Sequence, residues 1–262
     1  MKFCSLYSGS SGNCLYLEDN SVKILIDAGL SGKKIESALK EIQIQPEEID
    51  AILVSHDHQD HIKGAGVLSR RYNIPIYANE GTWSVAAKGL GKICEENIKV
   101  FKTGENVFIN DLCIFPFEIN HDAQEPVGFT LENTKKKVSI VTDTGIITED
   151  ILGKIKDSDL VIIESNHDVE MVKVGRYPYY LKKRVLSNRG HLSNDDAAKT
   201  ILKLVEHGLK NVLLAHLSEE NNFPELAFET TKSLLFENSI TVNEDVLVEV
   251  ASRFYRSSIF NI

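Results

Sequence analysis

The sequence predicts an α/β fold made of two mixed sheets with helices on their outer sides. Three observations favour this class. The first third of the chain alternates strand-length apolar runs with helical periods, the middle is rich in strands, and the last third resumes the alternation. A chain of 262 residues can bury one substantial core, and no low-complexity linker divides it. We therefore expect a single domain over residues 1–262 and two mixed sheets as the simplest packing.

Short apolar runs indicate strands, and apolar residues three or four positions apart indicate helices. In the first third, the expected strands are 3–7, 14–17, 22–27, 51–54 and 75–78, and the expected helices are 33–42, 62–72 and 83–88. In the middle, the expected strands are 107–109, 112–117, 127–131 and 138–141. In the last third, we expect strands at 160–163, 212–215 and 246–250, and helices at 148–155, after Ser193 and after Pro224.

A dense group of potential metal ligands follows the expected strand 51–54. His56, His58, Asp60 and His61 lie within six residues. In an extended segment, side chains at i and i+2 share one side, so three of these residues converge while His61 turns toward a second position. A solvated loop has no need of imidazole groups, and the end of a strand is where α/β proteins place active sites. The pattern favours two metal ions over one.

Three further candidate ligands stand just after expected strands. His121, Asp143 and His216 follow apolar segments, and such strand ends point into the same cleft. With the first cluster they make seven ligands, enough for two metal ions if one carboxylate bridges them. The most economical sharing gives one ion His56, His58 and His121, the other Asp60, His61 and His216, and lets Asp143 span both. Imidazole and carboxylate ligands favour Zn²⁺ and also suit Mn²⁺ or Fe²⁺.

The bulk composition bounds the partners and the compartment. The net charge of −9 argues against a general attraction to nucleic acid, although a local basic face can exist on an acidic protein. The apolar runs are too short to span a membrane, and the first residues lack a secretory signal. The four cysteines lack metal-finger spacing and indicate buried thiols in a reducing compartment. We expect a cytoplasmic protein; the sequence does not define its oligomeric state.

One region is both basic and aromatic. It contains Arg176, Lys182, Lys183, Arg184 and Arg189, interleaved with Tyr177, Tyr179 and Tyr180. Cations beside aromatic rings suit a phosphate chain with stacked bases, so Lys182, Arg184 and Arg189 are candidate substrate contacts. The alternative is an ordinary solvated helix face.

Four other polar residues have candidate roles. Asp60 can orient the nucleophile in addition to ligating metal. His191, in a glycine-bounded turn before a helix, is a candidate general acid or phosphate contact, with local packing as the alternative. Ser10 lies in the segment 8–13, which is either a tight hairpin turn or an edge that touches substrate phosphate. For His167, a role near the substrate and a structural role are equally supported.

The loop from His56 to His61, with its later His, Asp and His residues, resembles the signature of the metallo-β-lactamase superfamily. The resemblance implies a four-layer αβ/βα sandwich with a dinuclear site at one edge of the two sheets. Flavodiiron oxygen reductases usually carry Glu at the position of His58, which argues against that redox branch. More narrowly, the segments 8–14, 190–194 and 216–222 resemble the YycJ (WalJ) group, which lies near the ribonuclease Z and phosphodiesterase branches.

The resemblance implies a dinuclear metal-dependent phosphodiesterase, acting as a 5′-to-3′ exonuclease on DNA through a metal-bridging hydroxide. Two alternatives remain at this stage. One is hydrolysis of a small ester, thioester or cyclic phosphodiester by the same metals, and the other is a non-catalytic metal-binding module. A groove lined by Lys182, Lys183 and Arg184 that leads to the metals would favour a polymeric substrate.

Overall fold

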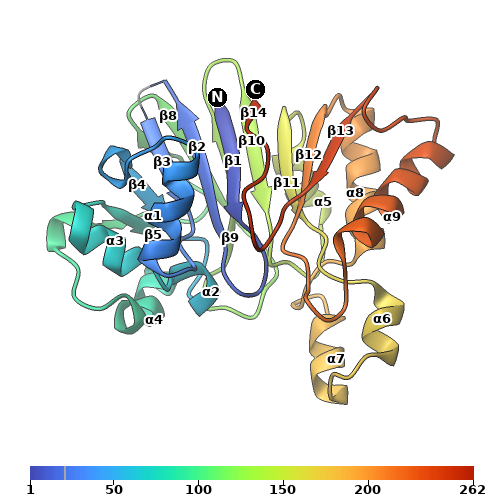
Figure 1. Cartoon of the computed structure of the whole chain (residues 1–262), viewed down its shortest axis with the longest axis horizontal. Coiled ribbons are helices and arrows are strands. Elements are labelled where there is room, and N and C mark those ends of the chain that lie inside the picture. Colours follow the sequence, from blue (N-terminus) through green and yellow to red (C-terminus); the bar gives the residue numbers. More distant parts are fainter. Residues whose placement is uncertain (21) are drawn as a thin grey trace. The chain divides into compact units, whose positions relative to one another are not determined.

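The computed structural model describes residues 1–20 and 22–262, which form two compact units. The first unit comprises Met1–Pro116, Ala123–Val127 and Ser252–Ile262, and the second comprises Phe117–Asp122 and Gly128–Ala251. Their strands form two seven-stranded sheets accompanied by helices (Figure 1). Both sheets combine parallel and antiparallel pairs, which confirms the predicted α/β class with two mixed sheets. Among the described residues, no helix combines the length and apolar character that crossing a membrane requires.

The first sheet has the strand order β14-β1-β2-β3-β4-β5-β6. Its strands are β1 (Lys2–Tyr7), β2 (Cys14–Asp19), β3 (Val22–Ile26), β4 (Ala51–Leu53), β5 (Ile76–Ala78), β6 (Ile98–Val100) and β14 (Phe260–Asn261). β3 runs antiparallel to β2 but parallel to β4, with Ile26 opposite Leu53. The chain therefore leaves β3 and β4 at the same edge of the sheet, and the residues that follow these two strands are brought close together.

The helices of the first unit are α1 (Gly32–Glu41), α2 (Gln59–Ile62), α3 (Ala65–Tyr72) and α4 (Glu80–Leu90), with short 3₁₀ turns at Pro46–Glu48 and Glu95–Asn97. In Figure 1, α1, α3 and α4 lie beside β3, β4 and β5. Ile35 and Leu39 of α1 and Leu68 of α3 share a buried core with Leu25 and Ile52 of the sheet. Burial of each such side chain stabilises the folded unit by roughly 1.5–3 kcal/mol. This packing holds in place the edge of the sheet at which β3 and β4 end and polar residues follow.

The second sheet has the order β13-β12-β11-β10-β9-β8-β7. Its strands are β7 (Val107–Ile109), β8 (Leu112–Glu118), β9 (Val127–Glu132), β10 (Lys137–Val141), β11 (Leu160–Glu164), β12 (Asn211–Ala215) and β13 (Leu247–Val250). The division between the two units falls inside β8, after Pro116. The strands from β10 to β13 are parallel, so Val141, Glu164 and Ala215 end at a common edge.

The helices of the second unit are α5 (Glu149–Ile155), α6 (Val169–Val174), α7 (Tyr179–Val185), α8 (Asn194–Glu206) and α9 (Pro224–Glu237). α8 packs on α9, and α9 packs on β13. Ser193 caps α8, because its Oγ accepts a hydrogen bond from the Asp196 N–H at 3.1 Å. In Figure 1, α6 and α7 project beyond the end of the strands, away from α8 and α9.

The prediction that the ligand segment is extended is wrong for its second half. Gln59–Ile62 forms α2, in which the His61 N–H donates to the His58 carbonyl at 3.0 Å. Asp60 and His61 are therefore successive residues of one helical turn, about 100° apart around its axis. The predicted helix 62–72 is also interrupted, because the Gly64 N–H donates to Ala28 O instead of continuing the helix. β6, β14, α6 and α7 were not among the expected elements.

The cysteines agree in part with the expected buried thiols. Cys4 and Cys14 are buried, but Cys94 is exposed, and that expectation was wrong for it. No disulfide is formed among the described residues.

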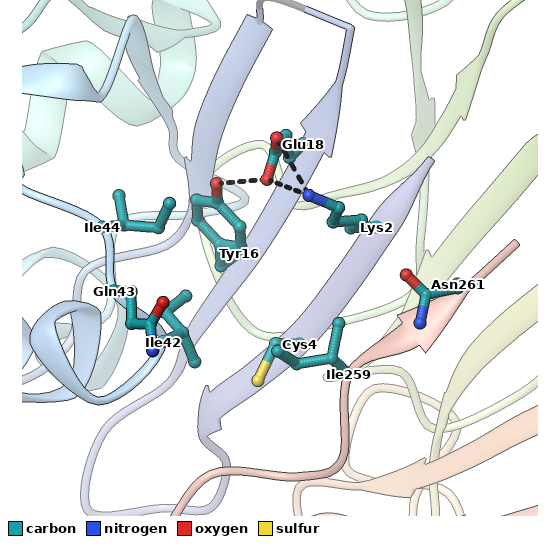
Figure 2. A pocket seen from close by; sticks show the side chains of 9 residues that line it. All are labelled: Lys2, Cys4, Tyr16, Glu18, Ile42, Gln43, Ile44, Ile259 and Asn261. Carbon is teal, nitrogen blue, oxygen red and sulfur yellow. Dashed lines mark hydrogen bonds and ion pairs between the residues drawn. The ribbon is translucent and has the colours of Figure 1, made fainter.

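A hollow of about 370 Å³ lies in the first unit between β1, β2, β14 and the turn after α1 (Figure 2). Its apolar wall includes Ile42 and Ile44, and its charged groups, Lys2 and Glu18, are paired with each other. Glu18 accepts hydrogen bonds from Tyr16 Oη at 3.1 Å and from Lys2 Nζ at 3.4 Å. The hollow therefore presents little uncompensated charge to a ligand.

Candidate metal centre

The four clustered ligands of the first unit lie between β4 and α3. His56 and His61 are fully buried, while His58 and Asp60 are half-buried. The ring centroid of His56 is 4.6 Å from that of His58 and 4.0 Å from that of His61. His61 Nε2 lies 3.6 Å from Asp60 Oδ2. The structure therefore brings together all four residues that the sequence motif predicted.

A buried carboxylate that the sequence analysis did not single out orients these imidazoles. Asp27 follows β3, and its Oδ2 accepts a hydrogen bond from His61 Nδ1 at 2.7 Å. The same carboxylate accepts the Ser55 N–H at 2.8 Å and the Ser55 hydroxyl at 2.9 Å. Ser55 Oγ also lies 3.0 Å from His56 Nδ1. Because each imidazole is held at Nδ1, its Nε2 is the nitrogen left to bind metal.

The turn between β1 and β2 packs against the same segment. The Asn13 N–H donates to Asp60 O at 2.8 Å, and the Asn13 side-chain nitrogen is 3.1 Å from His61 Nε2. Gly29 permits this close approach, because a Cβ there would lie 1.6 Å from Asp60 O. The segment 8–13 is thus the hairpin turn of two antiparallel strands, with Ser10 exposed in it. The role of Ser10 in phosphate binding stays a prediction.

In the second unit, His121, Asp143 and His216 follow β8, β10 and β12, as predicted, and all three are buried. Asp143 Oδ1 lies 3.4 Å from His216 Nε2 and 3.9 Å from His121 Nε2. Asp143 and His216 have φ values of 57° and 56°. This left-handed conformation is unfavourable for residues other than glycine, Asn and Asp, and the neighbouring strands must hold it in place.

Glu164, the last residue of β11, is the second functional residue that the sequence analysis missed. Its carboxylate is fully buried. Oε1 accepts hydrogen bonds from Nδ1 of His191 at 2.7 Å and from Nδ1 of His216 at 2.8 Å. Oε2 accepts the N–H groups of Thr144 at 2.9 Å and Leu192 at 3.2 Å. One carboxylate therefore fixes both imidazoles, as Asp27 does for His61 in the first unit.

The ionisation of this group follows from its contacts. Burial alone would raise the pKa of the Glu164 carboxyl, but the imidazoles of His191 and His216 outweigh burial and lower its pKa. Burial alone would lower the pKa of His191, but the adjacent Glu164 carboxylate outweighs it and raises that pKa. His121 Nδ1 faces the Gly190 carbonyl oxygen, and burial lowers the pKa of this imidazole. The two imidazoles therefore differ in the direction of their pKa shifts, because the Glu164 carboxylate opposes the effect of burial at His191.

The loop that carries His191 also supports His121. His121 Nδ1 donates to Gly190 O at 3.2 Å, and the Arg189 guanidinium donates to His121 O at 3.2 Å. A Cβ at Gly190 would lie 2.2 Å from Arg184 O, so glycine is required for this packing. The side chain of His191 is 20% exposed, whereas those of His121, Asp143 and Glu164 are almost fully buried. Within this group, His191 is the residue that solvent reaches.

The predicted substrate contacts divide into two sets. Arg189 and Arg184 lie at the ligand group, since Arg184 Nε forms an ion pair with Asp122 Oδ2 at 2.6 Å and Asp122 adjoins His121. Lys182 lies farther along α7, where its Nζ donates to Lys173 O of α6 at 2.7 Å. The structure therefore brings two of the three basic candidates to the candidate metal ligands of the second unit.

His167 has a structural position. It is 1% exposed, and its backbone pairs with Ser193 in an isolated bridge. Among the described residues, its Nδ1 has no hydrogen-bond partner. Burial lowers the pKa of His167 to about 4, so the imidazole is neutral in the folded protein at neutral pH.

This lowered pKa predicts a loss of stability in acid. The unfolded chain binds a proton at His167 below a pH of about 6.5, whereas the folded protein does not until about 4. The free energy of unfolding should fall by up to about 3 kcal/mol over this window because of His167. Urea unfolding of metal-free protein across the window should show a shallower pH dependence for His167→Asn than for the wild type. Equal slopes would contradict the assignment.

The donor sets fit divalent metal ions. In the second unit, one oxygen or nitrogen from each of Asp143, Glu164, His191 and His216 lies within 4.8 Å of the others. Two atoms that bind the same Zn²⁺ are about 3.3–3.6 Å apart, comparable to the 3.4 Å between Asp143 Oδ1 and His216 Nε2. Imidazole nitrogens held through Nδ1 and buried carboxylates are the ligands that Zn²⁺ and similar ions prefer.

Comparison with known proteins decides the family. The model of the β-lactamase superfamily domain matches residues 22–216. The exodeoxyribonuclease YycJ of Bacillus anthracis is 41% identical over 93% of this chain and 92% of its own length. The exodeoxyribonuclease WalJ of Streptococcus pneumoniae (strain D39) is 43% identical over 94% of this chain and 93% of its own length. The chain belongs to the metallo-β-lactamase superfamily, in the YycJ/WalJ family.

A solved structure supports the fold of this superfamily member. The metallo-β-lactamase fold protein YhfI from Bacillus subtilis superposes with a TM-score of 0.69, covering 98% of this chain and 99% of that one, at 16% identity. The predicted metallo-β-lactamase fold is therefore confirmed. At this identity the likeness concerns the fold alone.

Proposed function

We propose that this protein is a metal-dependent phosphodiesterase that degrades DNA as an exonuclease, in the 5′-to-3′ direction. The observation that carries the proposal is the identity of 41–43% to two exodeoxyribonucleases over nearly the whole chain, combined with the oriented imidazoles described above. The fold alone would not choose among substrates.

Two divalent ions are proposed to occupy the centre. His56, His58 and His121 would hold one, Asp60, His61 and His216 the other, and Asp143 would bridge them. This sharing makes residues 1–262 one functional domain, in agreement with a superfamily model that extends over parts of both units. Zn²⁺ suits the imidazole-rich set best, and Mn²⁺ or Fe²⁺ would also be accepted.

When bound, the two ions would lower the pKa of a bridging water toward about 7 and polarise the phosphoryl oxygen of the substrate. Asp60, half-buried beside His61, would orient the attacking water in addition to its role as a ligand. His191 would give a proton to the leaving oxygen. The Glu164 carboxylate raises the pKa of His191, which favours the protonated ring, and His191 is the partly exposed histidine of its group.

Basic residues would hold the DNA backbone. Arg189 and Arg184 stand next to His121 and can contact phosphate near the bond that is cleaved. Lys182 would contact phosphate farther along the strand, and Ser10 would do so from the β1–β2 turn. The protein would act in the cytoplasm, a location consistent with cysteines that form no disulfide among the described residues.

The test is hydrolysis by protein reconstituted with Zn²⁺ or Mn²⁺. End-labelled single- and double-stranded DNA, RNA and bis-p-nitrophenyl phosphate serve as substrates, with chelator-treated protein as a control. Stepwise release of nucleotides from DNA 5′ ends is expected. Turnover of the small ester alone would refute the nuclease proposal and favour a small-substrate hydrolase. Activity that survives chelation would show that no metal is needed.

A further inference from the structure

The segment 169–187, which we call the arm, contains α6, α7 and the turn between them. It carries five basic side chains and one acidic one, although the chain as a whole has a net charge of −9. Tyr179 is 83% exposed and Tyr180 is 73% exposed. Exposed aromatic rings among cations are unusual on a solvated helix face, where large apolar surfaces are normally avoided.

An open hollow of about 610 Å³ lies on the arm, mainly along α7. It is lined by Lys173, Tyr177, Tyr179, Lys182, Lys183, Leu186 and Ser187. Lys182 Nζ is held in place by its hydrogen bond to Lys173 O. Lys183 forms no ion pair with any described residue, so its ammonium group is available to an anion. The hollow thus combines aromatic walls with positive charge.

We propose that this hollow binds a nucleobase and the adjoining phosphates of single-stranded DNA. The inference rests on the proposed function and adds to it a binding site remote from the cleaved bond. Stacking on tyrosine is available to any base, and lysines bind the backbone without reading sequence, which is what an exonuclease on arbitrary DNA requires. The hollow in Figure 2 offers no such combination, because Glu18 already neutralises Lys2.

Contacts within the second unit lead from the hollow to the ligands. Ser187, on the wall of the hollow, packs closely on the loop after Asp143, since a Cβ at Gly145 would lie 2.3 Å from Ser187 O. On the same stretch, Arg184 pairs with Asp122 beside His121. A strand that leaves the hollow past Ser187 would therefore approach the loop after Asp143 and His191, the partly exposed residue of the ligand group, within the same unit.

Binding of phosphorothioate-linked, fluorescein-labelled oligothymidylate to metal-loaded protein tests the proposal by anisotropy. Tyr179→Ala should weaken binding about tenfold, and should have no effect on a labelled oligomer of the same length without bases. Lys183→Ala should reduce the slope of log affinity against log salt by about 0.7. Phe236→Ala and Lys199→Ala, which alter exposed residues on α9 and α8, serve as matched controls with wild-type binding expected.

The outcomes separate this inference from the proposed function. If wild type digests unmodified DNA and Tyr179→Ala binds oligothymidylate as tightly as wild type does, the hollow is refuted and the exonuclease stands. If Tyr179→Ala loses affinity while wild type digests no DNA, the hollow stands and the exonuclease is refuted. If wild type neither binds nor digests DNA, both are refuted. Thermal midpoints close to wild type would show that the variants are folded.

Discussion

Asp143→Asn should lower kcat/KM for metal-dependent phosphodiester hydrolysis by at least about 100-fold, which exceeds the effect of losing a typical outer partner of a metal ligand. The amide is neutral and is a poor bridging ligand, so the proposed pair of ions would lose its shared carboxylate. Asparagine is the correct replacement because it tolerates the left-handed backbone that Asp143 adopts, whereas alanine would add strain.

The matched control is Asp157→Asn. Asp157 also has a left-handed backbone, with φ of 60°, but it is exposed in the turn after α5. We expect it to keep wild-type activity and metal affinity. Steady-state hydrolysis of bis-p-nitrophenyl phosphate and calorimetric titration of Zn²⁺ give the two readouts. Asp143→Asn with activity within threefold of wild type and unchanged metal binding would exclude Asp143 as a ligand.

Glu164→Gln should reduce metal affinity and kcat roughly 10- to 100-fold, although Glu164 need not touch the substrate. One amide oxygen can still accept from His191 and His216, but the amide nitrogen then faces the N–H groups of Thr144 and Leu192. Each of these two N–H groups would lose its hydrogen-bond acceptor, which lowers the free energy of unfolding by about 1–3 kcal/mol per group. The melting temperature should therefore also fall. Asp27→Asn should act in the same way on His61.

A pH profile separates orientation from simple loss of stability. The Glu164 carboxylate raises the pKa of His191, so its removal should lower that pKa. Because the protonated imidazole is the proposed acid, the basic limb of the rate profile should move to lower pH in Glu164→Gln. Glu229→Gln, on the exposed face of α9, should leave the profile unchanged. A Glu164→Gln profile that is only scaled down would restrict Glu164 to a structural role.

The sequence was most informative where short-range pattern and chemistry coincide. Four ligands in six residues are visible without any fold, and the rule that polar residues after buried strands share an edge located His121, Asp143 and His216. The same rule, applied evenly, would also have indicated Asp27 after β3 and Glu164 at the end of β11. They were missed because they continue apolar strands, and their partners lie 34 and 27 residues away.

Other features could not be derived from local pattern. α2 is held by the hydrogen bond from the His61 N–H to the His58 carbonyl and by its contact with the β1–β2 turn, which Gly29 permits. The second contact is tertiary, so the hydrophobic periodicity of a four-residue helix cannot reveal it. Both helices of the arm are short, and its tyrosines face solvent instead of a core. The sequence there therefore lacks the amphipathic pattern that would have predicted a helix. β6, whose residues are all exposed, has no buried face to reveal it.

The placement of Asp143, Glu164 and His216 at the ends of β10, β11 and β12 bears on how a bound ion would escape. These strands have neighbours on both sides in their sheet and are almost wholly buried, so their ends cannot fray independently. An ion held there would therefore be retained until the second unit melts. Metal release and cooperative unfolding should accordingly share one transition on heating.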